Sequence, residues 1–323
     1  MKREIRDIRY DTALQIEAHL FHGKIQPFPN HFHDYYVIGI VEEGNRRLIC
    51  RGCRYEIEKG DILLFAPGDS HSCAARSGLL HYRSLNIAKE RMENLMRQAL
   101  RKPESRKASG AKEKSGFPEI SPKDRNIRSF ISAPNVLRDK ALFALLRNLH
   151  TAIFSIERSS GIQTSEAAHR EKLLCAAIAR LMFLYGCFRP FRKKESLSPE
   201  VERACAFIRT HFDEPLNLDR ICAHTGLGKS SLLRSFVRQK GITPYRYLEA
   251  VRIDQAKKYL GLGFSPADTA QLTGFSDQSH LTNSFRSRIG LTPGMYRRIF
   301  TTEPPAPDPS ESPYRYEKLR KKP

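Results

Sequence analysis

Residues 226–244 read GLGKSSLLRSFVRQKGITP, and residues 274–293 read GFSDQSHLTNSFRSRIGLTP. Both stretches contain a glycine followed by an apolar residue, then a leucine, a Ser-Phe pair, a second glycine and a Thr-Pro pair. The first glycines, Gly226 and Gly274, lie 48 residues apart and the later matching residues lie 49 apart, so the second copy carries one inserted residue at the turn. Self-similarity at a fixed spacing is typical of a duplicated supersecondary unit.

Each copy predicts two short helices joined by a tight turn. Apolar side chains recur at three and four over residues 229–239 and 277–288, which predicts the second helix of each pair. Gly226 and Gly274 can supply the positive φ that ends the first helix. This order is typical of a helix-turn-helix unit, whose second helix enters the DNA major groove. An ordinary helical hairpin would explain one copy equally well, but two copies joined by a helical pattern over 246–260 favour DNA binding.

The block from about residue 216 to residue 299 resembles the DNA-binding domain of AraC/XylS-type transcription regulators. The matching motifs are RIDQAK at 252–257, GFSDQS at 274–279 and GLTP at 290–293. The resemblance implies an all-α double helix-turn-helix domain, which we place at residues 200–300. Its two recognition helices are expected to enter successive major grooves about one helical turn apart.

The resemblance also implies which side chains contact DNA. The positions that match base-reading side chains are Ser230, Leu233 and Arg234 in the first recognition helix, and Gln278, Ser279, Thr282 and Asn283 in the second. Arginine can bind guanine O6 and N7 together, whereas glutamine and asparagine pair with adenine, so we expect an asymmetric site whose second half is richer in A·T. Candidate phosphate contacts, or simply solvated surface charges, are Arg238, Lys240, Arg252, Arg286 and Arg297.

The formal net charge of +20 is unevenly distributed along the chain. Residues 1–82 hold 11 basic and 11 acidic side chains, residues 83–130 hold 13 against 6, and residues 200–300 hold 15 against 9. Basic surface favours polyanions such as nucleic acid. The sequence contains no long apolar run and its first residues, Met-Lys-Arg-Glu, start no apolar signal segment, so we expect no membrane partner and a cytoplasmic location.

The first 90 residues read as β-structure. Short apolar runs alternate with glycine-containing turns, which predicts an antiparallel sandwich or barrel. The runs are 35–41, 47–50, 55–57 and 61–65. The sequence GDILLFAPGDSH at 60–71, preceded by HFH at 31–33, resembles the cupin-type sensor domain of many AraC-like regulators. That resemblance implies an antiparallel β-barrel over residues 1–90 with a small-molecule effector inside it.

Three histidines, His31, His33 and His71, are our candidates for the effector pocket together with Tyr35. In metal-binding cupins a His-x-His pair, a glutamate and a later histidine converge on one ion, and imidazoles suit zinc, iron, manganese or nickel. In this chain Tyr-Val-Ile at 36–38 stands where the glutamate should fall. We therefore expect effector contact and neither a metal nor another cofactor, with a functional metal left as the alternative.

Cys50-Arg51-Gly52-Cys53 has the spacing of a zinc or redox site. The central Arg-Gly is also an ordinary hairpin turn, which would place the two thiols across a strand pair. The sequence has seven cysteines but no second Cys-x-x-Cys, and we favour the hairpin. Without a secretion signal, we expect these cysteines to be reduced.

The remaining boundaries follow from composition. Residues 91–130 form a basic segment that we expect to be a mobile insertion, residues 189–199 a Pro-bounded linker, and residues 301–323 a Pro-rich disordered tail. Leucine and isoleucine recur at three and four within residues 131–188, which predicts helices that cover the barrel. The resemblance to AraC-like regulators implies in addition that these helices pair two sensor domains in a homodimer. The expected chain is multidomain, with α and β parts.

Together these features predict a sequence-specific DNA-binding transcription regulator, not an enzyme, controlled by a small molecule in the N-terminal barrel. The family mostly activates, so the resemblance implies an activator that contacts RNA polymerase. Two other classes stay open. One is a metal-dependent cupin enzyme. The other is an architectural DNA-binding protein, for which random DNA would compete as well as any single site.

Overall fold

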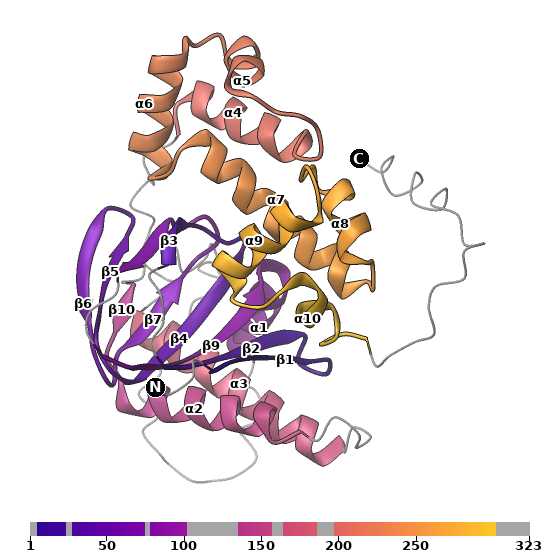
Figure 1. Cartoon of the computed structure of the whole chain (residues 1–323). Helices are drawn as coiled ribbons and strands as arrows, with labels where there is room; N and C mark the ends of the chain where they lie inside the picture. Colours follow the sequence, from indigo (N-terminus) through magenta and orange to yellow (C-terminus); the bar gives the residue numbers. More distant parts are fainter. Residues whose placement is uncertain are drawn as a thin grey trace.

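The computed structural model describes residues 5–23, 28–74, 78–101, 135–156, 164–185 and 197–301. A β-sheet part lies in the middle of the molecule, with three helices on one side and the C-terminal helices on the other (Figure 1). The expected tail from residue 302, most of the expected linker and residues 102–130 of the expected insertion lie outside the described residues.

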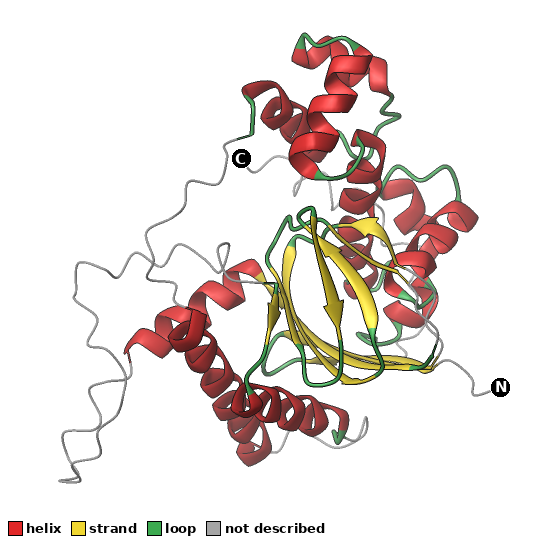
Figure 2. Cartoon of the chain, turned by 90° about the vertical axis from the view of Figure 1, so that its left-hand side faces the viewer, coloured by secondary structure: helices red, strands yellow, loops and turns green. Residues whose placement is uncertain are grey.

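Within the described residues, the strands form two antiparallel sheets. The larger sheet has the order β1 (Ile5–Asp11), β2 (Ile16–Gly23), β9 (Leu80–Ala88), β4 (Tyr35–Glu43), β7 (Ile62–Phe65) and β10 (Val136–Leu137). The smaller sheet has the order β3 (Phe28–His31), β8 (His71–Ala74), β5 (Arg46–Cys50) and β6 (Cys53–Ile57). Figure 2 shows the two sheets facing each other.

Of the two antiparallel architectures expected, sandwich or barrel, the described strands form an open two-sheet sandwich. Closing a barrel requires a continuous ring of paired strands, and no strand pairing within the described ranges joins the two sheets. Apolar side chains from both sheets hold them together instead, among them Phe21 on β2, Leu48 on β5 and Phe65 on β7. The interior between the sheets is therefore bounded by side chains rather than by a ring of backbone ladders.

The Cys-x-x-Cys segment forms the hairpin turn between β5 and β6. Cys50 pairs with Cys53 across the two strands, and Arg51 and Gly52 both have positive φ, as a tight two-residue hairpin requires. Cys50 is buried, and its burial raises the pKa of the thiol to about 12, whereas Cys53 is exposed. A thiol with a raised pKa is a poor nucleophile, so the geometry agrees with the structural interpretation.

Three helices cover the outer face of the larger sheet: α1 (Lys89–Arg101), α2 (Lys140–Phe154) and α3 (Thr164–Tyr185). They share one core with strands β2, β4, β7 and β9, to which α2 contributes Leu142 and Leu149 and α3 contributes Leu174 and Ile178. Residues 91–101, expected at the start of a mobile insertion, belong instead to α1, because Met92 and Leu95 are fully buried in this core. The larger sheet is thus covered on both faces.

The C-terminal part is all helical, as expected. Its helices are α4 (Pro199–Thr210), α5 (Leu218–Thr225), α6 (Lys229–Lys240), α7 (Pro244–Gly261), α8 (Pro266–Leu272), α9 (Gln278–Ile289) and α10 (Pro293–Arg297). Gly226 ends α5 with φ 76°, and Gly274 follows α8 with φ 73°, which confirms the two turns predicted from the repeat. Side-chain hydroxyls of Thr243 and Thr292 cap α7 and α10, so the repeated Thr-Pro begins a helix in both copies.

Each helix-turn-helix core includes one residue from the sheet part. Phe32 lies in the core formed by α4–α7, where its ring stacks on Tyr247 at 4.7 Å between centroids. Ile8 lies in the core formed by α7–α10. The two parts of the chain are therefore packed together through apolar contacts. Among the helices that the structure describes, none is both long and apolar enough to span a membrane.

Candidate functional site

The two recognition helices predicted from the repeat are α6 and α9, and α7 lies between the two helix pairs (Figure 1). On α6, Ser230, Leu233 and Arg234 are all exposed, and Leu233 is 40 % exposed although it is apolar. An apolar side chain left in solvent beside an arginine is consistent with a surface that meets a partner. The opposite face of α6 carries Leu232 and Phe236, which are fully buried.

Helix α9 presents its expected readers in the same way. Gln278, Ser279 and Asn283 are exposed and Thr282 is half-buried. The carboxylate of Asp277 caps the helix by accepting a hydrogen bond from the backbone N–H of His280 at 2.8 Å. Both recognition helices therefore expose polar side chains from their N-terminal halves, which is the end that contacts base edges in helix-turn-helix proteins.

The five expected phosphate contacts differ in their surroundings. Arg238 and Arg286 are exposed, whereas Lys240 and Arg297 are half-buried. Arg252 donates from Nε to the carbonyl of Phe212 at 2.7 Å and from Nη2 to the carbonyl of Glu214 at 2.9 Å. These bonds tie α7 to the segment after α4, which gives Arg252 a structural role.

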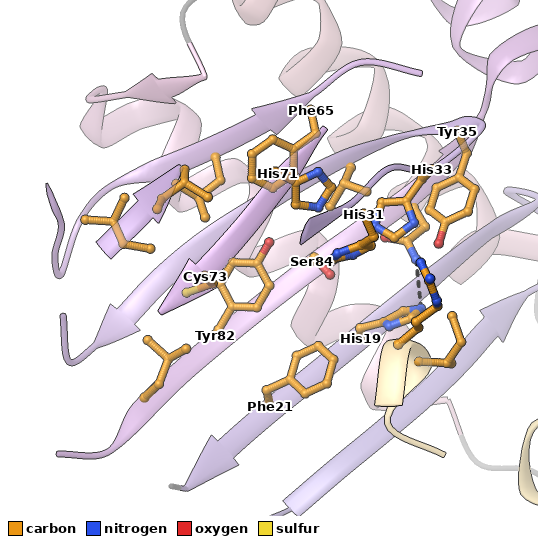
Figure 3. A pocket seen from close by; sticks show the side chains of 18 residues that line it. His19, Phe21, His31, His33, Tyr35, Phe65, His71, Cys73, Tyr82 and Ser84 are labelled. Atoms are coloured by element: carbon orange, nitrogen blue, oxygen red, sulfur yellow. Dashed lines mark hydrogen bonds between the residues drawn. The ribbon is translucent and has the colours of Figure 1, made fainter. Parts of the chain in front are cut away.

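A cavity of about 110 Å³ lies between the two sheets (Figure 3). Much of its wall is apolar and comes from both sheets: Phe21, Val37, Leu48, Ile57, Leu63, Phe65 and Leu80. The four expected pocket residues all line it, and so do the polar residues His19, Cys73, Tyr82, Ser84 and Asn86. Arg288 and Ile289, at the C-terminal end of α9, complete the wall. The cavity thus lies within the sensor part and is bordered on one side by the second helix-turn-helix.

The imidazoles of His31, His33 and His71 point toward one another in this cavity (Figure 3). Their ligand atoms lie within 4.8 Å of one another. His71 donates from Nδ1 to the carbonyl of Asp69 at 2.9 Å, because a carbonyl can only accept, so its Nε2 keeps a lone pair. Burial lowers the pKa of His71 to about 4 and that of His33 well below its usual value, which keeps both rings neutral at pH 7.

Neutral imidazoles at this spacing could hold a divalent metal ion with one coordination position open to the cavity. Among the described residues, this cluster contains three histidines and no carboxylate. The aromatic neighbours constrain two of the rings: Phe65 stacks on His71 at 4.1 Å and Tyr35 stacks on His33 at 4.7 Å. The same arrangement can instead bind an organic ligand through hydrogen bonds and ring contacts, so the geometry suits both uses.

A buried ionic network lies beside the cavity, between the larger sheet and the C-terminal helices. Lys257 on α7 forms an ion pair with Glu17 on β2 at 2.9 Å. The Glu17 carboxylate also accepts a short hydrogen bond from the hydroxyl of Tyr296 on α10. Nε2 of His19 lies 3.1 Å from the same carboxylate. Burial alone would raise the pKa of Glu17, but Lys257 and these hydrogen bonds hold it below its usual range.

Sequence reasoning missed Glu17, His19 and Arg288. The two former residues lie on β2, whose sequence IEAHLFHG alternates apolar and polar residues and could have been recognised as a strand. Arg288 carried no signal, because a basic residue in the last turn of a helix is ordinarily solvated and favoured by the helix dipole. Only the packing of α9 against the sheets identifies it as a cavity residue.

Comparison with known proteins agrees with this division of the chain. Residues 14–178 match the family described as AraC-like ligand binding domain, and residues 221–299 match a helix-turn-helix domain family. The helix-turn-helix-type transcriptional regulator YbfI of Bacillus subtilis is 38 % identical over 304 residues, covering 94 % of this chain and 99 % of that protein. The transcriptional activator RhaS of Escherichia fergusonii is 25 % identical, covering 89 % of this chain and 93 % of its own.

A solved structure shares the overall fold. A variant of ToxT from Vibrio cholerae superposes with a TM-score of 0.51 at 13 % identity, covering 91 % of this chain and 100 % of that one. At this identity the likeness concerns the fold alone. It supports the order of an antiparallel sheet domain followed by a helical domain.

Proposed function

Because the chain belongs to the AraC family of transcription regulators, we propose that it binds a bipartite DNA operator with α6 and α9 and responds to a small molecule held between its two sheets. Such proteins combine a ligand-binding domain with a helix-turn-helix domain. The observation that carries the proposal is the shared wall of the cavity, to which both the sensor sheets and the recognition helix α9 contribute side chains.

Base reading is assigned to the exposed side chains of the two helices. On α6 these are Ser230, Leu233 and Arg234, and on α9 they are Gln278, Ser279, Thr282 and Asn283. Arg238, Lys240, Arg286 and Arg297 are proposed to contact phosphates, and Arg252 is left out because its guanidinium holds α7 to the preceding segment. The resulting operator is asymmetric, with a guanine contact in the half read by α6.

The effector is proposed to contact His31, His33, Tyr35 and His71. A mostly apolar wall with a few convergent polar groups is typical of small-molecule sites. Because residues of α9 close the same cavity, a ligand there would change the stability of the contact between the two domains. The proposed output is activation through contact with RNA polymerase in the cytoplasm, with a homodimer as the proposed assembly.

Selection of DNA sites from a random library by the full-length protein tests the proposal. The enriched sequences should contain two half-sites about one helical turn apart. The selected operator should bind about 10³-fold or more tightly than random DNA. Equal binding of random DNA would instead indicate an architectural protein. Transcription from a template that carries the selected operator, with and without the protein, then decides between activation and repression.

The histidine cluster supports a second candidate, a metal-dependent enzyme built on the same sandwich. Elemental analysis of the purified protein distinguishes the two. Stoichiometric iron together with turnover of a small molecule would favour the enzyme. A bound metal that changes operator affinity, with no turnover of any small molecule, would support the transcription regulator over the enzyme.

A further inference from the structure

Arg288 is a buried cation whose hydrogen-bonding capacity is only partly used. It lies in the last turn of α9 and is 6 % exposed. Its Nη2 donates to the carboxylate of Glu249 on α7 at 2.6 Å. Its Nε and Nη1 are buried and have no hydrogen-bond partner among the described residues. A guanidinium carries five N–H donors and keeps its charge when buried, so unpaired donors in this position are unfavourable.

The position of this guanidinium at the cavity would allow a bound ligand to accept hydrogen bonds from it. Arg288 lines the cavity together with His19, Tyr35 and Asn86 from the larger sheet. The carboxylate of Glu17, on the larger sheet nearby, is already bound to Lys257 and Tyr296. Glu249 is shared between Arg288 and Arg246, with Nη1 of Arg246 at 2.9 Å. The described residues therefore leave an excess of positive hydrogen-bond donors at this end of the cavity.

The rest of the wall defines the other end of a matching ligand. It is apolar over Phe21, Val37 and Leu63, and the cavity of about 110 Å³ is somewhat smaller than one that holds a benzene ring. We infer that the cavity binds a small organic acid, whose carboxylate accepts hydrogen bonds from Arg288 and whose apolar body, a short alkyl chain, lies between the two sheets. This inference rests on the proposed effector site and adds the chemical class of the ligand.

The inference also specifies how the signal reaches DNA. Arg288 lies on the same helix as the proposed base readers Gln278 and Asn283, so the ligand contacts the recognition helix itself. A carboxylate bound to Arg288 strengthens the contact of α9 with the sheets. The coupling is reciprocal: the factor by which the acid changes operator affinity equals the factor by which the operator changes acid affinity. No intervening element is needed for this coupling.

Ligand-detected NMR with the full-length protein tests the acid class. The probes are propanoate and butanoate at millimolar concentration, compared with their neutral amides, propanamide and butanamide. We expect both acids to bind at least about tenfold more tightly than the amides, because the carboxylate is itself ionised and pairs with the guanidinium charge, whereas the amide offers only a neutral carbonyl. Amides that bind as tightly as the acids, or acids that do not bind at all, would overturn the inference.

Variants locate the binding group. Arg288→Gln keeps a donor for Glu249 but removes the charge, and should weaken acid binding about tenfold or more while leaving amide binding unchanged. Arg298→Gln, at an exposed arginine that ends α10, is the matched control and should change neither. Unchanged acid affinity in Arg288→Gln would show that Arg288 does not bind the carboxylate. The comparison of acid with amide in the unmodified protein decides the ligand class even where the variant does not fold.

A third variant separates this inference from the proposed effector site. Val37→Phe fills the cavity from β4 and should reduce the binding of every probe. If Val37→Phe abolishes binding but amides bind as well as acids, the cavity remains the effector site and only the acid class is wrong. If Val37→Phe leaves acid binding intact, the acids bind outside the cavity and the inference fails, whereas the proposed effector site is not tested by that result.

Discussion

Glu17 on β2 and Lys257 on α7 are separated by 240 positions in the chain and form a 2.9 Å ion pair between the two domains. The Lys257 side chain is 9 % exposed and that of Glu17 is 12 % exposed. The Lys257 ammonium also lies 4.1 Å from the ring centroid of Tyr35, which lines the cavity. Burial tends to lower the pKa of Lys257, but Glu17 raises it well above its usual value, so the pair stays charged at neutral pH.

Removing one member of this pair should destabilise the docked arrangement. Glu17→Gln removes the carboxylate that is ion-paired with the buried Lys257, and we expect a loss of on the order of 3 kcal/mol in the free energy of unfolding. Lys257→Met should have a similar effect, because Glu17 then loses its cation. The double variant should recover much of this loss. Urea denaturation of the four proteins gives the coupling energy directly.

Lys258→Met is the control, since Lys258 is the next residue of α7 and is exposed. Its free energy of unfolding should change by less than about 0.5 kcal/mol. If Glu17→Gln behaves like this control, the ion pair contributes nothing to docking. Additive losses in the double variant would lead to the same conclusion.

The two turn glycines of the repeat should differ in their tolerance of alanine. Gly226 has φ 76° with open space around its Cα, so Gly226→Ala costs only the backbone strain of a left-handed residue, about 1 kcal/mol. At Gly274, a Cβ would lie 2.7 Å from the carbonyl oxygen of Phe212. Gly274→Ala should therefore cost about 2 kcal/mol more, which denaturation of both variants will measure. Equal losses would show that the second turn relaxes freely.

The helix-turn-helix part could be predicted because its determinants are local. Periodicity at three and four sets α6 and α9, and Gly226 and Gly274 set the turns, all within spans of a few residues. The sandwich could not be predicted in the same way. Strand β2 pairs with β9, with Ala18 opposite Leu85, and neither strand was recognised. Strand order depends on such long-range pairings, which leave little trace in a single sequence.

The same distinction holds for the candidate site. His31, His33 and His71 were found because two of them share a short motif and their residue type suggests ligand contact. Arg252 was expected at phosphate, but the carbonyls that it binds belong to residues 212 and 214, which only the packing of α7 brings near. Arg288 is hidden for a similar reason. Its bond to Glu249 on α7 and its place in the cavity wall depend on long-range packing that the sequence of α9 does not show.

The buried His150 on α2 should make the protein less stable in acid. Its Nε2 donates to the carbonyl of His19 at 2.9 Å, and its Nδ1 accepts from Arg83 at 3.1 Å, so the ring is neutral. Burial, opposed by the bond to His19 and assisted by Arg83, lowers the pKa of His150 to about 3. The unfolded chain then binds a proton that the folded chain rejects. This stability is complete above about pH 6.5 and is lost as the pH falls toward 3.

His150→Gln is the variant that isolates this contribution, because other buried histidines also titrate. Between pH 7 and pH 5 the unmodified protein should lose about 2 kcal/mol more in its free energy of unfolding than the variant does. Urea denaturation at several pH values measures both curves. Parallel curves would show that His150 is already protonated in the folded protein or that its pKa is not lowered.

The two recognition helices should contribute unequally to base discrimination. Arg234 on α6 is exposed and can bind guanine with two hydrogen bonds, so Arg234→Ala should reduce discrimination at one base pair by about 1–3 kcal/mol. Gln278→Ala on α9 should reduce discrimination at an A·T pair in the other half-site. Arg238→Ala, on the same helix as Arg234, should weaken binding to all DNA sequences alike. It should also reduce the slope of log affinity against log salt concentration by about one. Competition binding against single-base variants of the selected operator measures all three. Uniform weakening in Arg234→Ala would remove it from the base-reading set and leave it as a phosphate contact.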